Sequence, residues 1–110
     1  MERFVKGNVI IIPFPFSDLS DSKRRPALVL ADLHGNDIIL CQITSQNSSD
    51  YFSINLDNND FENGSLPVNS FIRPNRIFTA DKNIIIRKVG KITNEKLNSV
   101  YNALNILFRI

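Results

Sequence analysis

The feature that most constrains the fold of this 110-residue chain is a proline between a basic segment and an apolar one. Three cations at residues 23–25 are followed by Pro26 and then by the apolar residues 27–31. Proline has a φ fixed at about −65° and no N–H to donate in a sheet, so it suits the first residue of a strand. The apolar run is typical of a buried strand. The sequence therefore predicts a core strand that starts at Pro26, with Arg25 at its rigid entrance and the other two cations in a looser loop.

Arg25 is a candidate phosphate-binding residue because of this placement. Its guanidinium is planar, charged at any relevant pH and able to make two parallel hydrogen bonds to one phosphate. A short basic run at a strand entrance is also the usual form of a solvated loop. The run alone therefore leaves both interpretations open.

Other segments also have the composition of strands, with β-branched and aromatic residues in excess. They cover residues 8–16, 38–45, 51–56, 70–79 and 84–92. Pro13 and Pro15 lie on one face of the first segment, which is therefore expected at an edge of the sheet or leaving it. Pro74 indicates an edge or a bulge, and Gly90 a bend. Residues 57–64 are acidic and rich in asparagine, and a loop is expected there.

After position 92 the apolar residues change from the period of a strand to that of a helix. Thr93 suits the N-cap, and Glu95 suits the positive end of a helix. Apolar side chains then recur at helical spacing at Leu97, Val100, Tyr101, Leu104, Leu107 and Phe108. Short strands followed by one helix favour a mostly β (α+β) fold, a small antiparallel barrel with a C-terminal α-helix. A chain of this length has room for one core, so a single domain over residues 1–110 is expected.

Composition excludes several classes of function. No apolar stretch approaches the roughly 18 residues of a membrane span, and no signal-peptide pattern is present. Cys41 is the only cysteine, so no internal disulfide can form and a reduced, cytoplasmic setting is expected. His34 is the only histidine, which rules out an imidazole pair, and no Cys/His cluster has zinc spacing. There is no glycine-rich phosphate-binding motif, and no metal or cofactor is expected.

The distribution of charge favours an anionic partner. Residues 71–110 hold eight Lys or Arg against Asp81 and Glu95, whereas residues 51–70 hold three acids and no cation. A basic C-terminal third together with the basic residues 23–25 is typical of proteins that bind nucleic acid.

The side chains left for chemistry are cations and hydroxyls. In the segment 38–45, alternation places Gln42 and Thr44 on one face. RNA carries its own nucleophile, the ribose 2′-OH beside each phosphate. A protein that cleaves RNA can therefore act by aligning this group, stabilising the charge of the transition state and helping protons to move. An arginine stabilises such charge without a metal, and DNA, which lacks the 2′-OH, would not be cut in this way.

Several segments together resemble the MazF/PemK toxins of bacterial toxin–antitoxin systems. The matching segments are residues 7–16, 23–30, 41–46, 77–82 and 89–92, with the helix after them. Residues 51–70 match least. In some members an arginine directly precedes a Thr-x-Asp sequence where this chain has Phe78, and Arg76 is the nearest cation on the same face of a regular strand.

The resemblance implies an SH3-like barrel, a homodimer and a metal-independent, sequence-selective endoribonuclease that acts on single-stranded RNA such as mRNA. It implies a 2′,3′-cyclic phosphate product and control by a cognate antitoxin with an acidic, disordered tail. The family's catalytic arginine directly precedes the proline, here Arg25, and its catalytic threonine lies in the third strand, here Thr44. Asp81 is a candidate third catalytic residue. The candidate RNA-binding residues are Phe16, Ser17, Lys23, Arg24, Ser45, Gln46 and Arg76.

An alternative on the same fold is a barrel without catalysis. Such a protein would bind a protein partner, as gyrase-poisoning toxins of similar fold do, or bind RNA without cutting it. The pair of Arg25 and Thr44 favours the nuclease, because a pure binding module has no need of it.

Overall fold

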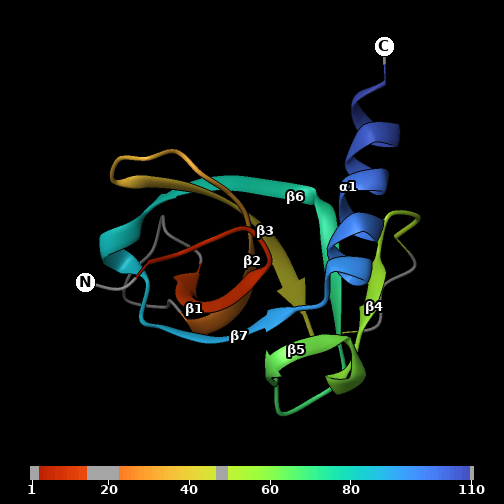
Figure 1. Ribbon diagram of the computed structural model, residues 1–110, viewed down its shortest axis with the longest axis horizontal. Coiled ribbons are helices and arrows are strands. Elements are labelled where there is room, and N and C mark those ends of the chain that lie inside the picture. Colours follow the sequence, from red (N-terminus) through yellow and green to blue (C-terminus); the bar gives the residue numbers. More distant parts are fainter. Residues whose placement is uncertain (1–2, 15–22, 47–49, 110) are drawn as a thin grey trace.

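The computed structural model, which describes residues 3–14, 23–46 and 50–109, is a strongly curved antiparallel sheet with one helix packed against it (Figure 1). The strands are β1 (Asn8–Phe14), β2 (Lys23–Asp32), β3 (Asp37–Thr44), β4 (Ile54–Leu56), β5 (Phe61–Gly64), β6 (Ser70–Asp81) and β7 (Arg87–Ile92). The helix α1 covers Asn94–Phe108, and two 3₁₀ turns, η1 and η2, cover Asn58–Asp60 and Lys82–Ile84. Across the sheet the strands follow the order β4-β6-β3-β2-β1-β7-β5. The expected fold class, a mostly β curved barrel with a C-terminal helix, is confirmed.

The basic residues before Pro26 belong to β2, which corrects the expectation that the strand starts at the proline. Lys23 and Arg24 pair with Phe14 and Pro13 of β1, although a loop was expected at this position. The physical reason is that a proline in a strand still has a carbonyl that can accept a hydrogen bond, so Pro13 does not end β1, which stays extended far enough to pair with residues upstream of Pro26.

Pro74 lies in a bulge of β6, one of the two alternatives that the sequence left open. Gln42 of β3 is opposite Arg73, whereas the preceding Cys41 is opposite Ile77, so that β6 carries extra residues at this point. β6 is not an edge strand, because β3 and β4 flank it. The bulge lets a proline sit in the interior of the sheet without the loss of a ladder hydrogen bond.

Three further segments differ from the sequence-based expectation. Residues 57–64, expected as a loop, contain η1 and the strand β5, which pairs with β7. Asp57 caps η1 by accepting a hydrogen bond from the backbone N–H of Asn59 at 2.8 Å. The expected strand over residues 51–56 is reduced to β4, and that over 84–92 is reduced to β7. Long-range pairing of β5 with β7 overrides the turn-forming composition of this region.

The curved sheet buries apolar side chains on both faces. One cluster lies under α1, and its fully buried members include Val9, Leu28, Ile43, Ile72, Ile92 and Val100. The other fills the inside of the curve, with Ile10, Ile12, Val29, Ile38 and Leu40. Since alternate residues of one strand enter different clusters, β1, β2 and β3 are buried on both sides, which explains their nearly unbroken apolar sequences.

The strands β5 and β7 approach each other closely at two glycines. Gly64 has a φ of 74°, and a Cβ there would lie 2.0 Å from the carbonyl oxygen of Val89. A Cβ on Gly90 would lie 2.5 Å from the carbonyl oxygen of Asn63. The register between β1 and β7 also shifts beside Gly90, where a bend was expected from the sequence. This close contact fixes where the chain leaves β5 for β6.

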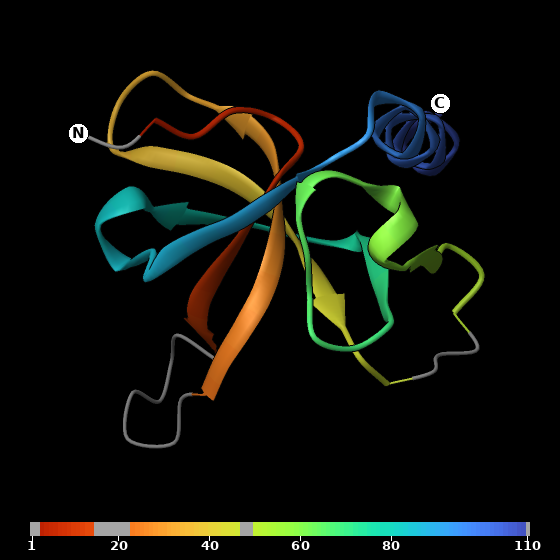
Figure 2. The same ribbon diagram turned by 60° about the horizontal axis from the view of Figure 1, so that its bottom comes forward.

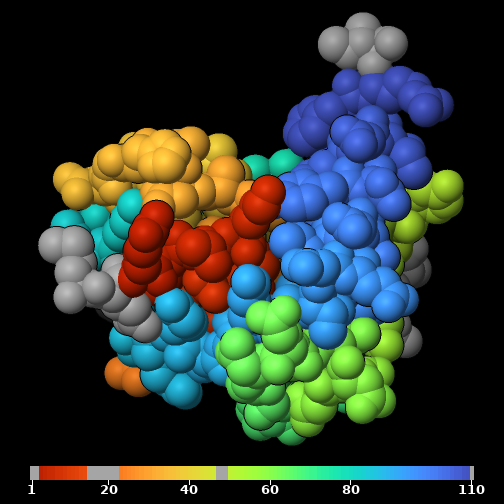
Figure 3. All heavy atoms as spheres, in the orientation of Figure 1, coloured from red at the N-terminus to blue at the C-terminus, as the bar shows by residue number. Residues whose placement is uncertain are grey.

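The helix α1 begins as the sequence predicts. The hydroxyl oxygen of Thr93 accepts a hydrogen bond from the backbone N–H of Lys96 at 3.2 Å, and the hydroxyl of Tyr101 donates one to the carbonyl of Leu30 at 2.6 Å. The second half of α1 projects beyond the body of the sheet (Figure 3). For this reason Ile106 and Phe108 are exposed, although the spacing of apolar residues predicted that Phe108 would face the core. Within the described part of the chain, α1 is too short and too polar to cross a membrane.

Candidate functional site

A cleft of about 810 Å³ opens where β2 begins and β3 ends. The residues that line it come mainly from β2, β3, β7 and the segment between β5 and β6, and Figure 2 shows how these parts of the backbone are arranged. The lining residues are Ile11, Arg24, Arg25, Pro26, Ile43, Thr44, Ser45, Gly64, Ser65, Leu66, Pro67, Val68, Ser70, Arg87, Lys88 and Val89.

The floor of the cleft is a row of residues on neighbouring strands. Ile11 of β1 is opposite Pro26 of β2 on one side and opposite Arg87 of β7 on the other. Residues opposite each other in antiparallel strands share a face, and so do residues two apart on one strand. Arg24, two residues before Pro26, is therefore on the same face as Arg87. The two guanidiniums flank an apolar floor from opposite sides.

Arg25 and Thr44 lie at the same level of adjacent strands. The ladder between β2 and β3 ends at the pair Ala27 and Gln42. Arg25 and Thr44 each lie two residues beyond this pair, on their own strands. Both side chains are half-buried, and both border the cleft. Because side chains alternate along a strand, they lie on the opposite face of β2 and β3 from the floor residues Pro26 and Ile43. The two residues that the sequence singled out are thus brought together at one rim of the cleft.

The hydroxyl of Thr44 is held by its own loop. Its oxygen accepts a hydrogen bond from the backbone N–H of Gln46 at 3.2 Å. A hydroxyl has one proton to donate and a second lone pair, so this contact orients the group and leaves it able to bind a ligand. Ser45, between these residues, is exposed and lines the cleft.

Among the described residues that line the cleft, all four charged side chains are cations: Arg24, Arg25, Arg87 and Lys88. Elsewhere the cations are often neutralised, as in the ion pairs Arg73–Asp50 at 3.0 Å, Lys82–Asp32 at 2.6 Å and Lys96–Asp60 at 3.4 Å. Lys88 donates a hydrogen bond from Nζ to the carbonyl of Arg3 at 2.7 Å and lies over the ring of Phe4, so part of its capacity is used within the fold. The three arginines have no such partner in the described part of the chain. The site is therefore suited to binding an anion with several charges.

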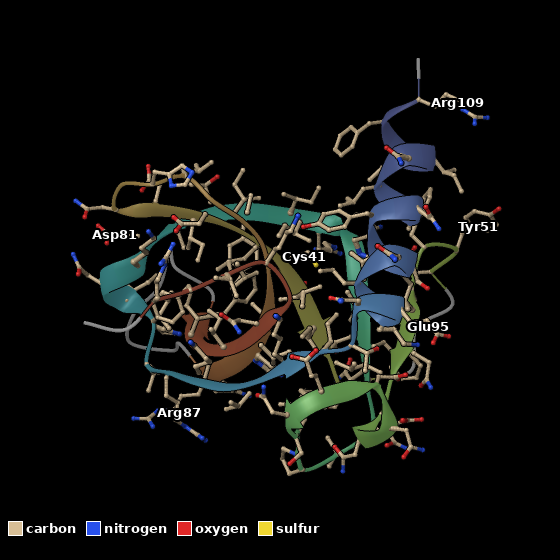
Figure 4. All side chains as sticks on the ribbon, in the orientation of Figure 1. Cys41, Tyr51, Asp81, Arg87, Glu95 and Arg109 are labelled. Carbon is tan, nitrogen blue, oxygen red and sulfur yellow. The ribbon has the colours of Figure 1, made fainter. Side chains whose placement is uncertain are left out.

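Other predicted site residues lie around the cleft or away from it. Lys23 and Gln46 are exposed beside residues that line it. Arg76 is exposed at the β6 bulge and is not part of the lining. Asp81 is the last residue of β6 (Figure 4), whereas Ser70, the first residue of this strand, lines the cleft. The carboxylate of Asp81 caps η2 by accepting a hydrogen bond from the N–H of Asn83 at 2.8 Å. Phe16 and Ser17 lie outside the described residues.

Sequence reasoning missed Arg87 and the apolar wall formed by residues 65–68. The signal for Arg87 was present in the basic C-terminal third of the chain and in the strand expected there. Its place in the cleft depends on the pairing of β7 with β1, which no local pattern reveals. The wall of residues 65–68 depends in turn on the contact between Gly64 and Gly90.

The described residues contain no group of three or more His, Cys, Asp or Glu side chains that could hold a metal ion. Cys41, a potential ligand or nucleophile by chemistry, is fully buried, and burial raises the pKa of its thiol to about 12. Among the described residues, the polar groups that can act in the cleft are therefore guanidiniums, the ammonium of Lys88, hydroxyls and backbone amides.

A family model for the PemK-like, MazF-like toxin of type II toxin–antitoxin systems matches residues 5–108. No curated protein matches the chain by sequence.

Solved structures of MazF proteins share the fold. The chain is similar to MazF from Deinococcus radiodurans, with a TM-score of 0.77, 19% identity and coverage of 100% of both chains. It is similar to a chain in a crystal structure of MazE–MazF from the same organism, with a TM-score of 0.76, 17% identity and coverage of 100% of this chain and 99% of that chain. A third similar structure is an endoribonuclease in complex with its cognate antitoxin from a mycobacterial species. There the TM-score is 0.73 and the identity 16%, over 96% of this chain and 93% of that chain.

Proposed function

The chain belongs to the PemK-like, MazF-like toxins of type II toxin–antitoxin systems, and on this premise we propose that it is an endoribonuclease that cleaves single-stranded RNA at the cleft between β2 and β3. The observation that carries the proposal is the convergence of Arg25 and Thr44 on one rim of a cleft whose charged lining, among described residues, is wholly cationic. A phosphodiester is the anion that such a site fits, and the ribose 2′-OH is a nucleophile that comes with it.

In the proposed reaction the 2′-oxygen attacks the adjacent phosphorus and the bond from phosphorus to the 5′-oxygen breaks. The products are a 2′,3′-cyclic phosphate and a 5′-hydroxyl. Negative charge grows on the non-bridging oxygens as the 2′–P bond forms. The guanidinium of Arg25 neutralises this charge through paired hydrogen bonds, and the hydroxyl of Thr44 donates a further one.

The proton of the 2′-OH must leave, and the 5′-oxygen must gain one. The described lining contains no carboxylate and no imidazole, so we assign both transfers to water. The contribution of the protein is then alignment and charge stabilisation.

The test is the incubation of the purified protein with a long single-stranded RNA and with DNA of the same sequence, in excess EDTA. The RNA should be cut at defined positions, with cyclic phosphate and 5′-hydroxyl ends, and the DNA should stay intact. Activity that disappears with the chelator and returns with magnesium, or equal cutting of DNA, would contradict the proposal. RNA binding without cleavage would favour the non-catalytic alternative.

We also propose that a cognate antitoxin with an acidic, disordered segment covers this cleft. A segment of that kind can wrap an extended basic surface. A homodimer is proposed as well, since Ile106 and Phe108 on α1 are 58% and 63% exposed and an interface between copies would cover them. Sedimentation of the free protein tests the homodimer, and a monomer at micromolar concentration would exclude it.

A further inference from the structure

Arg87 lines the cleft without a contact in the described part of the chain, and neither the sequence-based list of RNA-binding candidates nor the proposed reaction gives it a role. It lies at the start of β7, and its side chain points away from the body of the sheet in Figure 4. It is exposed, and the described residues include no carboxylate that pairs with it. An exposed arginine is commonly just solvated. The residues around Arg87 indicate instead that its charge belongs to the cleft.

Three observations connect Arg87 to the cleft rather than to the open surface. It lies in the floor row, opposite Ile11, which is itself opposite Pro26. The lining of the cleft includes it together with Arg24 and Arg25. The neighbouring cation, Lys88, is turned to the N-terminal segment, where it binds the carbonyl of Arg3. Among the described residues of the lining, Arg87 is therefore the positive charge on the β7 side that has no contact within the fold.

The separation of the strands decides which phosphate Arg87 can reach. Thr44 is on β3, and β2 and β1 lie between it and β7. Three strand spacings amount to about 14 Å along the sheet. A phosphate held at the rim between Arg25 and Thr44 is thus on the far side of the floor from Arg87. An RNA strand that crosses the floor presents further phosphates to the β7 side.

We propose that Arg87 binds a second, uncleaved phosphate of the RNA, so that the strand lies across the floor of the cleft from β2 to β7. This inference rests on the proposed function. It adds a second binding position, which fixes the path of the RNA across the floor of the cleft. Arg87 is in this view a positioning residue. It holds the substrate in both the ground state and the transition state, so its loss should raise KM and leave kcat nearly unchanged.

The test measures binding of a random-sequence pool of single-stranded 2′-O-methyl RNA, which has no free 2′-OH and cannot be cleaved by the proposed route. Arg87→Ala should bind about tenfold more weakly than the wild type at low salt, because a hydrogen bond between charged groups contributes about that factor. The slope of log affinity against log salt should fall by about 0.7, the value for one phosphate of a single strand. Arg87→Lys should restore the slope, since it keeps the charge.

Arg109→Ala is the matched control. It removes the same side chain from the far end of α1 (Figure 4), which is not part of the cleft lining, and it should leave both affinity and slope unchanged. Thermal unfolding of each variant excludes a loss of fold. An Arg87→Ala variant that behaves as Arg109→Ala does, with the same slope as the wild type, would overturn the second phosphate position.

The two proposals fail in different ways. If Arg25→Ala abolishes cleavage of RNA while Arg87→Ala changes neither KM nor the salt slope, the proposed nuclease stands and the role of Arg87 is wrong. If the wild type does not cleave RNA but Arg87→Ala lowers the salt slope, the nuclease is wrong and the phosphate position stands. A weakened complex with an acidic peptide, with the affinity for RNA unchanged, would also reject the RNA assignment.

Discussion

Nη2 of Arg73 donates a hydrogen bond to Oδ2 of Asp50 at 3.0 Å, and the two side chains are only 19% and 12% exposed. Arg73 is opposite Gln42 in the ladder between β6 and β3, two residues from Thr44. The ion pair therefore ties the far end of the segment that follows Thr44 back to the sheet. It also neutralises the cation of β6 that lies closest in register to Thr44.

Arg25 and Thr44 should be needed for cleavage and dispensable for folding. Arg25→Ala and Thr44→Val should each lower kcat/KM by about 10²–10³, the usual cost of removing one donor to a transition state. Arg25→Lys should recover little, because an ammonium cannot make the paired hydrogen bonds of a guanidinium. Rates on a fluorogenic RNA, with thermal unfolding as the check on structure, test this. Wild-type turnover by Arg25→Ala would remove Arg25 from the reaction.

Asp50 should make the stability of the protein depend on acid pH. The backbone N–H of Phe52 and then the guanidinium of Arg73 hold the pKa of Asp50 below its ordinary value of 3.8. A lowered pKa means that the folded state binds the proton less readily than the unfolded state does. The stabilisation is thus fully present above pH 3.8 and is lost as the pH falls through the folded pKa.

Urea unfolding of the wild type and of Asp50→Asn measures this effect. The difference in their free energies of unfolding should be constant between about pH 5 and pH 7 and should shrink below pH 3.8. A difference that does not change with pH would mean that the carboxylate contributes only through its shape.

The thiol of Cys41 should be unreactive in the folded protein. Burial raises its pKa to about 12, so that at pH 8 the thiolate, which is the reactive form, is nearly absent, and reagents cannot reach it. A maleimide should label the protein in urea and leave it unlabelled in buffer. Rapid labelling in buffer would show that β3 opens locally.

Gly64→Ala should destabilise the protein and distort the wall of the cleft. The new Cβ would meet the carbonyl of Val89, and alanine would be strained at a φ of 74°. Overpacking and backbone strain each cost about 1–3 kcal/mol. Gly35→Ala is the control, because a Cβ at Gly35 has no atom within 4 Å. Equal melting temperatures of the two variants would contradict the close contact of β5 with β7.

Charge reversal at the start of β2 should weaken the antitoxin complex. Lys23→Glu combined with Arg24→Glu should lower the affinity at least about tenfold at low salt and less at high salt, since exposed charges are screened. Arg109→Glu provides the comparison at a distant position. An affinity that stays the same at both salt concentrations would place the antitoxin on another surface.

The local parts of this fold were predictable from the sequence. Pro26 with the apolar run after it, the cap at Thr93 and the bulge allowed by Pro74 each follow from neighbouring residues. The proximity of Arg25 and Thr44 was also within reach, because β2 and β3 are consecutive and antiparallel.

Arg87 and the wall of residues 65–68 were beyond sequence reasoning for one physical cause. Both positions depend on β7, which pairs with β1 and β5, and the pairing with β1 joins segments about eighty residues apart in the chain. The composition of residues 57–64 favours turns, and only the pairing partner makes part of it a strand. Neighbouring residues in the sequence do not reveal the pairing register of two strands that lie so far apart in the chain.

The position of β1 between β2 and β7 also has a consequence for synthesis. β1 can complete its pairing only after β7, about eighty residues later in the chain, has been synthesised. The cleft therefore cannot be complete until Arg87 and the rest of β7 have been translated. Contacts between such distant segments also slow folding. A nascent or truncated chain that ends before β7 would have Arg25 and Thr44 but only part of the cleft around them. The proposed activity against RNA would then be gained only after β7 has been made.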